Sequence, residues 1–141
     1  MQFIPYLNFN GKCKEAMEFY AQVLRADVES MMTFAGTPAE EHVTPEHRGE
    51  IMHASLRMDG RTILMASDVG DMPFEKTAGM SVSIVLDDTP EAERIYAELA
   101  EGGSVTMPME KTFWAERFGA CVDRYGIPWM INSGMPADAT P

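Results

Sequence analysis

The chain has 141 residues, with 22 aspartate and glutamate residues against 11 lysine and arginine residues, and a formal net charge of −11. An apolar fraction of 45% is enough to bury a core, which excludes global disorder. The negative charge repels phosphate backbones and anionic headgroups, so we expect neither nucleic acid nor an anionic membrane as a partner.

No apolar run approaches the length of a membrane-spanning helix, and residues 1–6 lack the charged and apolar regions of a signal peptide. The two cysteines, Cys13 and Cys121, form neither a Cys-x-x-Cys motif nor a disulfide framework, and neither has an obvious activating partner. We therefore expect a cytoplasmic, globular protein.

The first half of the chain predicts a strand, a helix and three further strands. An apolar run predicts a strand over residues 3–9. Apolar residues then recur with the i, i+3, i+4, i+7 spacing of one helix face, at Ala16, Phe19, Tyr20 and Val23. Strands are predicted at 28–35, 51–58 and 62–67, and Asp59-Gly60 between the last two indicates a hairpin.

The second half predicts the same order of elements. Its strands are expected at 80–86, 104–107, 115–123 and 127–132. The helix between the first two has a clear start, with Thr89 as the expected N-cap and Pro90 at the first helical position. The first helix is less clearly marked, because Lys12 and Lys14 are unfavourable near the positive end of a helix dipole.

The two halves also match in sequence at an offset of 76 residues. Glu15-Ala16 corresponds to Glu91-Ala92, and Tyr20 corresponds to Tyr96. Each half thus predicts a βαβββ module. We expect modules at 1–67 and 80–133, a linker at 68–79 and a flexible tail at 134–141, together making one structural domain.

Several short motifs are similar to those of one protein family. They are Pro5-Tyr6-Leu7 followed by Gly11 and Glu15-Ala16-x-x-Phe19-Tyr20, Ile51-Met52-His53-Ala54, Phe113-Trp114-x-x-Arg117-Phe118-Gly119, and the run from Asp123 to Asn132. Together with the repeated module, they resemble the PhnB-like branch of the vicinal oxygen chelate superfamily (glyoxalase, bleomycin resistance proteins and dioxygenases). The resemblance covers residues 1–133 and implies an α+β fold in which two βαβββ modules form a curved mixed sheet.

The resemblance also implies where a divalent metal would bind in metal-dependent relatives. When the family's ligand positions are carried over relative to the shared helix, they fall on Pro5 and Ser81, near Met65, and on or near Met130. Proline has no side-chain donor, methionine sulfur is a poor ligand for magnesium, zinc or iron(II), and one serine is weak. We therefore expect no metal and no cofactor.

The concave face of such a sheet is the expected ligand site. By strand parity, the inward candidates are Pro5, Leu7, Phe9, Met65, Ser81, Ser83 and Met130. Trp114 beside Arg117 could hold a flat or anionic molecule, although Trp114 could equally serve core or dimer packing. We expect Trp129 in the core and Asp123 in a turn.

The three histidines differ in what their positions indicate. His42 and His47 lie in an acidic stretch and are expected to be solvated loop residues. His53 lies on a predicted strand, on the same face as Ile51 and Ser55. It is either a buried, hydrogen-bonded imidazole or a polar group in the cavity, where it is also the candidate general base.

Three functions agree with these features. The first is binding of a small organic molecule without a metal, or its modest enzymatic conversion, using His53, Met65, Ser81, Trp114, Arg117 and Met130. The second is a metal-dependent lyase, isomerase or dioxygenase with relocated ligands such as Glu50 and His53. The third is a dimerisation scaffold with a vestigial cavity. The resemblance implies a homodimer in each case.

Overall fold

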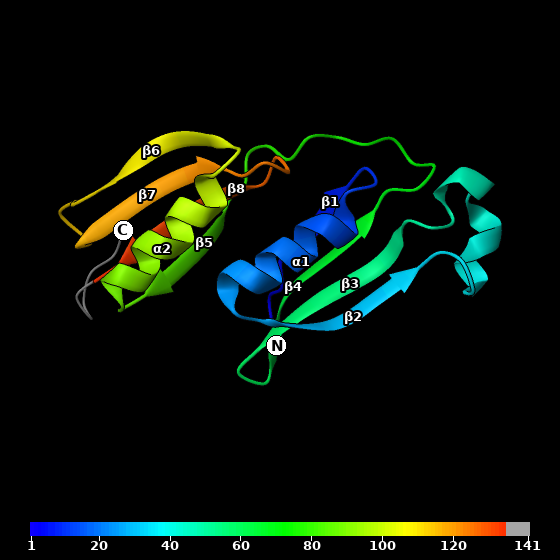
Figure 1. The fold of residues 1–141 in the computed structure, drawn as a ribbon, viewed down its shortest axis with the longest axis horizontal. Coiled ribbons are helices and arrows are strands. Elements are labelled where there is room, and N and C mark those ends of the chain that lie inside the picture. Colours follow the sequence, from blue (N-terminus) through cyan, green and yellow to red (C-terminus); the bar gives the residue numbers. More distant parts are fainter. Residues whose placement is uncertain (135–141) are drawn as a thin grey trace. The chain divides into compact units, whose positions relative to one another are not determined.

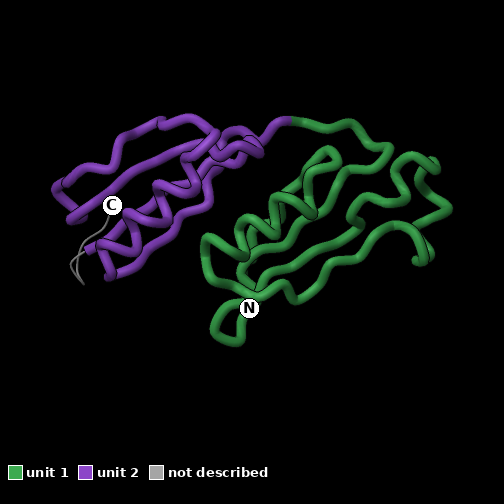
Figure 2. Tube along the Cα trace, viewed as in Figure 1, with its two compact units in different colours: residues 1–75 green, residues 76–141 purple. Residues whose placement is uncertain are grey.

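The structure is a computed structural model that describes residues 1–134. The chain divides into two compact units, Met1–Glu75 and Lys76–Pro141 (Figure 2). All of the predicted tail except Gly134 lies outside the described residues. Within residues 1–134, no helix is long and apolar enough to cross a membrane.

Unit 1 is a four-stranded mixed sheet with one α-helix (Figure 1). Its elements are β1 (Tyr6–Phe9), α1 (Cys13–Leu24), β2 (Asp27–Thr33), the short 3₁₀ helices η1 (Pro38–His42) and η2 (Pro45–His47), β3 (Ile51–Met58) and β4 (Arg61–Asp68). The strand order is β1-β4-β3-β2, with β1 parallel to β4 and the other pairs antiparallel.

Unit 2 repeats this topology. Its elements are β5 (Val82–Leu86), α2 (Thr89–Ala100), β6 (Ser104–Glu110), β7 (Arg117–Val122) and β8 (Pro128–Ser133). The order is β5-β8-β7-β6, and β5 is parallel to β8. The predicted α+β fold of two βαβββ modules is confirmed, and each module forms a four-stranded mixed sheet of its own.

The apolar stripe of each helix lies against its own sheet. In α1 the buried side chains are Cys13, Ala16, Met17, Tyr20 and Val23. Phe19 is only half-buried while Met17 is buried, because the buried stripe lies farther around the helix, on the side of Met17, than the predicted one. In α2 the buried side chains are Ala92, Ile95 and Leu99.

The start of α1 is stabilised from another strand rather than by a local cap. Lys12, at the N-cap position, makes no capping hydrogen bond through its side chain. Instead, the buried carboxylate of Asp68, the last residue of β4, accepts hydrogen bonds from the backbone N–H groups of Gly11 (2.8 Å) and Cys13 (3.0 Å). Its second oxygen accepts from the N–H of Ile51 (2.9 Å). This negative charge also offsets Lys12 and Lys14 at the positive end of the helix dipole.

The start of α2 is capped locally, but the expected cap residue is wrong. The N-cap is Asp88, whose side chain accepts from the N–H of Glu91 (3.0 Å). Thr89 is already in the helix, because an Asp-Thr-Pro sequence offers two possible caps and only the first has the extended backbone that capping requires. Ser133, the last residue of β8, occupies the place that Asp68 has in β4, and its hydroxyl donates to Thr89 Oγ1 (3.2 Å).

The predicted inward direction of Leu7 and Phe9 is wrong. Both are buried, and they pair with Ala66 and Asp68 on the sheet face that carries the cap of α1. Side chains alternate along a strand, so Tyr6 and Asn8 are the β1 residues on the opposite face. Leu7 and Phe9 alternate with Tyr6 and Asn8, but an apolar cavity and a helix-covered core both favour apolar side chains, so the alternation does not show which of the two Leu7 and Phe9 line.

Two turn predictions and one core prediction agree with the structure. Asp59 and Gly60 connect β3 and β4 with positive φ angles of 50° and 79°, as a tight hairpin requires. Asp123 accepts from the N–H groups of Tyr125 (2.8 Å) and Ile127 (3.0 Å) and closes the turn before β8. Trp129 is 1% exposed and donates to the same carboxylate (2.7 Å).

Candidate functional site

Each helix covers one face of its sheet, and we call the other face of each sheet its open face. On unit 1 the cross-strand pair Tyr6–Met65 lies on this face, and on unit 2 the equivalent pair is Ser83–Met130. The equivalence follows from the strand ends, because Phe9 pairs with Asp68 in one sheet and Leu86 pairs with Ser133 in the other. Met65 and Met130, both candidate ligand contacts, therefore occupy matching positions.

The open face of unit 1 carries an aromatic side chain next to His53. The Tyr6 hydroxyl lies 3.3 Å from His53 Nδ1, and the two ring centroids are 5.9 Å apart. His53 is half-buried and Tyr6 is 48% exposed. The structure thus places His53 at this face rather than inside the core. Its Nδ1 is engaged by Tyr6, which orients the ring.

A polar cluster lies farther along the same face, centred on Glu29. Its carboxylate accepts from the hydroxyls of Ser55 (3.2 Å) and Thr62 (2.9 Å), and Arg57 lies 3.7 Å away. The register between β2 and β3 shifts between Val28 and Ser30, at Glu29 itself. Sequence reasoning missed Glu29, because a β-bulge that redirects a side chain leaves no clear signal in the sequence. It missed Tyr6 because the parity of β1 was assigned to the other face.

The open face of unit 2 is more aromatic. Trp114 Nε1 donates to Asn132 Oδ1 (3.0 Å), which holds the indole over β8. Its ring makes edge contacts with Phe113 and Phe118, with centroids 4.8 and 5.4 Å apart. Phe118 pairs with Asn132 across the strands, and both are buried, whereas Phe113 is 91% exposed. Met130 is two residues before Asn132 on β8 and so shares its face. Ser81 is exposed and precedes β5.

Arg117 lies on the helix-covered face of unit 2. Its Nε donates to Glu93 Oε1 on α2 (2.8 Å), and its cross-strand partner is Ser133, which contacts Thr89 at the start of α2. The expectation that Trp114 and Arg117 lie side by side is therefore wrong. The physical reason is the two-residue period of β7, because Phe118, which contacts Trp114, directly follows Arg117 and points to the opposite face.

The strand register also moves two of the expected metal positions. The helices start 76 residues apart, at Cys13 and Thr89, but the strands before them end 77 residues apart, at Phe9 and Leu86. The connection is one residue shorter in unit 2, so a ruler based on the helices misplaces the strands by one residue. The side chains beside Met65 and Met130 are Tyr6 and Ser83. Tyr6 lies one residue from the expected Pro5, and the shorter connection adds one residue more, so Ser83 lies two residues from the expected Ser81.

These side chains do not fit the divalent cation of the superfamily. A phenol, a hydroxyl and two thioethers lack the imidazole and carboxylate donors that such a cation prefers. Within residues 1–134, no three His, Cys, Asp or Glu side chains converge as a metal site. The alternative ligands also point apart, since Glu50 Oε1 contacts His47 Nδ1 whereas His53 Nδ1 contacts the Tyr6 hydroxyl.

Neither cysteine offers a nucleophile. Both are buried. Burial, with a smaller contribution from Asp68, raises the pKa of Cys13 to about 12, and burial together with Asp123 raises the pKa of Cys121 to about 11. The thiolate form that carries cysteine reactivity is therefore scarce at neutral pH.

Comparison with known proteins identifies the family of this chain and agrees with its fold. The family model described as 3-demethylubiquinone-9 3-methyltransferase matches residues 1–132. Protein YjdN of Escherichia coli strain K12 is 34% identical over 142 residues, which cover 94% of this chain and 95% of YjdN. The crystal structure of PA1353 from Pseudomonas aeruginosa is 42% identical with a TM-score of 0.87, covering 96% of this chain and 99% of PA1353.

Two more distant structures share the fold. The PhnB protein from Bacillus cereus is 24% identical with a TM-score of 0.78, covering 95% of this chain and 100% of that one. A glyoxylase/bleomycin resistance protein/dioxygenase domain from Frankia sp. EAN1pec is 15% identical with a TM-score of 0.63, covering 97% and 93%. The chain therefore belongs to the PhnB-like family described as 3-demethylubiquinone-9 3-methyltransferase, with the fold of the glyoxalase/bleomycin resistance/dioxygenase superfamily.

Proposed function

We propose that this protein binds a small organic molecule on the open faces of its sheets, without the metal of the glyoxalase superfamily. One observation carries the proposal, and it recurs in both units. Each open face has an aromatic ring whose polar atom is already oriented by a neighbour, Tyr6 by His53 and Trp114 by Asn132. A flexible methionine, Met65 or Met130, lies on the same face. Oriented rings give specificity, and thioethers adapt to ligand shape.

The methyltransferase activity named in the family description is not part of this proposal. A nucleotide-like cofactor is typically held by a glycine-rich turn between a strand and a helix. The corresponding connections here are residues 10–12 and 87–88, which contain one glycine and two aspartates, respectively. Neither has the expected pattern.

Methionine methyl signals offer a direct test of binding. In protein labelled with [methyl-¹³C]methionine, a library of small aromatic and heteroaromatic compounds is screened by NMR, and signals are assigned with Met65→Leu and Met130→Leu. We expect compounds that bind to shift the methyl signal of Met65 or Met130. Met17, which is fully buried on the sheet-facing side of α1, is the control, and its methyl signal should not shift. A library in which no compound moves either open-face signal would refute the proposal.

The Tyr6–His53 contact and the absence of a metal have their own tests. Tyr6→Phe removes the hydroxyl that orients His53. It should weaken the binding of a compound that shifts the Met65 signal about fivefold, which is the effect of losing one hydrogen bond.

Calorimetric titration with Zn²⁺, Ni²⁺, Mn²⁺ and Fe²⁺ should give no stoichiometric binding. Stoichiometric binding that His53→Ala abolishes would instead favour the metal-dependent lyase, isomerase or dioxygenase.

We also propose that the protein is a cytoplasmic homodimer. The edge strands β2 and β6 expose apolar side chains, Val28 and Met32 on one and Val105 and Met107 on the other. Exposed apolar edges favour coverage by another chain. Light scattering during size-exclusion chromatography measures the mass directly, and a monomer would contradict the proposal.

A further inference from the structure

The segment between β2 and β3 folds back onto the chain that follows β4. Asp71 Oδ2 accepts from the N–H of Thr44 (2.9 Å), and Asp71 Oδ1 accepts from the Thr44 hydroxyl (2.9 Å). Val43 is buried, and a Cβ atom built on Gly70 would lie 3.1 Å from Val43 and 3.5 Å from the ring of Phe34. Residues 34–50 therefore pack tightly on residues 69–71.

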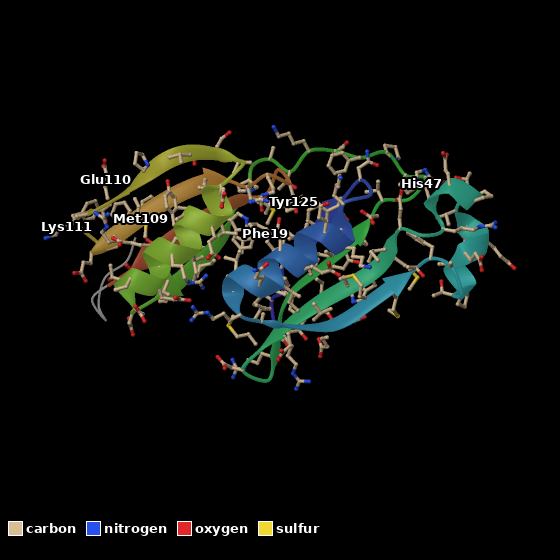
Figure 3. The ribbon with its side chains drawn as sticks, in the orientation of Figure 1. Phe19, His47, Met109, Glu110, Lys111 and Tyr125 are labelled. Carbon is tan, nitrogen blue, oxygen red and sulfur yellow. The ribbon has the colours of Figure 1, made fainter. Side chains whose placement is uncertain are left out.

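His47 joins three carboxylates from different parts of this contact. Figure 3 shows its side chain in the segment between β2 and β3. Its Nδ1 lies 2.7 Å from Oε1 of Glu50, the residue before β3. Its Nε2 lies 3.6 Å from Asp71 Oδ1, after β4, and 3.6 Å from Glu46 Oε1, in η2. Both ring nitrogens therefore face acidic oxygens.

The inner part of this cluster is shielded from water. The side chains of His47 and Glu50 are only 24% and 21% exposed. Glu50 Oε2 is buried and has no hydrogen-bond partner within residues 1–134. Charge that is partly desolvated interacts more strongly than charge at the surface. The Glu50 carboxylate therefore depends on His47 for its compensation.

We propose that His47, Glu46, Glu50, Asp71 and Thr44 form a pH-operated clasp that fastens residues 34–50 to residues 69–71. When the imidazole is protonated, its positive charge holds the three carboxylates together. When it is neutral, the carboxylates of Glu46, Glu50 and Asp71 repel one another and the segment opens. Within unit 1, the clasp is a switch between a fastened and a released segment.

The electrostatics give the direction of the switch. The hydrogen bond to Glu50, with the charges of Glu50, Glu46 and Asp71, raises the pKa of His47 above that of an ordinary histidine. A group whose pKa is higher in the folded state stabilises that state most below its unfolded pKa of about 6.5. The stabilisation is lost as the pH rises from there through the folded pKa. The clasp is thus closed in mild acid and opens toward alkaline pH.

Trypsin cleavage after Arg48 reports on the clasp, because the carbonyl of Arg48 accepts from the N–H of Ala35 (2.8 Å) while the segment is folded. Cleavage is followed from pH 6 to pH 9 and divided by the rate on a free peptide of residues 44–52, which removes the pH dependence of trypsin. We expect normalised cleavage of the wild-type protein to rise about threefold or more over this range, as expected for a local opening. His47→Gln should be cleaved at every pH at the high normalised rate that the wild-type protein reaches at pH 9. His42→Gln should show the same rise in cleavage with pH as the wild-type protein.

NMR titration of the His47 ring gives a second readout that does not depend on cleavage. We expect its pKa to lie above that of an ordinary histidine, and Asp71→Asn to lower it. The proposal is overturned if wild type and His47→Gln share one cleavage profile, or if His42→Gln removes the pH dependence. It is also overturned if His47 titrates like an ordinary histidine.

Discussion

The carboxylate of Asp68 is the strongest candidate for a single side chain that stabilises unit 1. It accepts three backbone hydrogen bonds, from Gly11, Cys13 and Ile51, and connects the start of α1 to β3 and β4. Asp68→Ala would leave the N–H groups of Cys13 and Ile51, both in buried residues, without this acceptor. An unsatisfied buried donor costs about 1–3 kcal/mol. Loss of negative charge at the helix N-terminus adds about 0.3–1 kcal/mol.

We therefore expect Asp68→Ala to lower the free energy of unfolding by about 3–5 kcal/mol, a large part of the stability of a small domain. Urea unfolding followed by far-ultraviolet circular dichroism measures this loss. Asp88→Ala is the matched control, because it removes the local cap of α2, which accepts one hydrogen bond, and should cost about 1 kcal/mol. Asp68→Asn keeps one acceptor oxygen, so its loss in the free energy of unfolding should lie between those of Asp68→Ala and Asp88→Ala. Equal losses for Asp68→Ala and Asp88→Ala would refute the assignment of Asp68 as the cap of α1.

Two further predictions follow from burial and backbone geometry. At pH 8 the raised pKa values leave about one Cys13 side chain in 10⁴ and one Cys121 side chain in 10³ as the thiolate. Ellman's reagent should therefore react with neither cysteine in the native protein and with both in guanidinium. Rapid reaction of the native protein would contradict the burial of the two cysteines. A Cβ atom on Gly60 would meet no other atom, but the φ angle of 79° is unfavourable for alanine. Gly60→Ala should therefore lower the free energy of unfolding by about 1 kcal/mol. Gly103→Ala would press against the backbone of Val122 and Asp123 and should cost about 3 kcal/mol, measured by the same urea unfolding. Equal costs for the two glycine variants would contradict the steric argument.

The sequence by itself determined the elements and their order. Helix α1 and helix α2 follow from the 3.6-residue period of their apolar stripes, and the hairpin follows from Asp59-Gly60. These signals lie between residues close together in the chain, so local chemistry is enough to produce them. The repeat then implied two modules of one topology, and the structure has that topology in both units.

The candidate site was predicted only in part. Met65 and Met130 lie on the open faces, and His53 lies beside Tyr6. Arg117 lies on the other face, with Glu93, and no sequence pattern indicated that ion pair.

Only the tertiary structure decided which residues meet across strands. The one-residue difference between the connections before α1 and α2 shifts β5 against the helix-based offset, so that the counterpart of Tyr6 beside Met130 is Ser83 rather than Val82. The bulge at Glu29 and the contact of His47 with Asp71 likewise join residues that are far apart in the chain. Such contacts depend on strand register, and a shift of one residue turns a side chain to the opposite face of the sheet. No local pattern in the sequence records that shift.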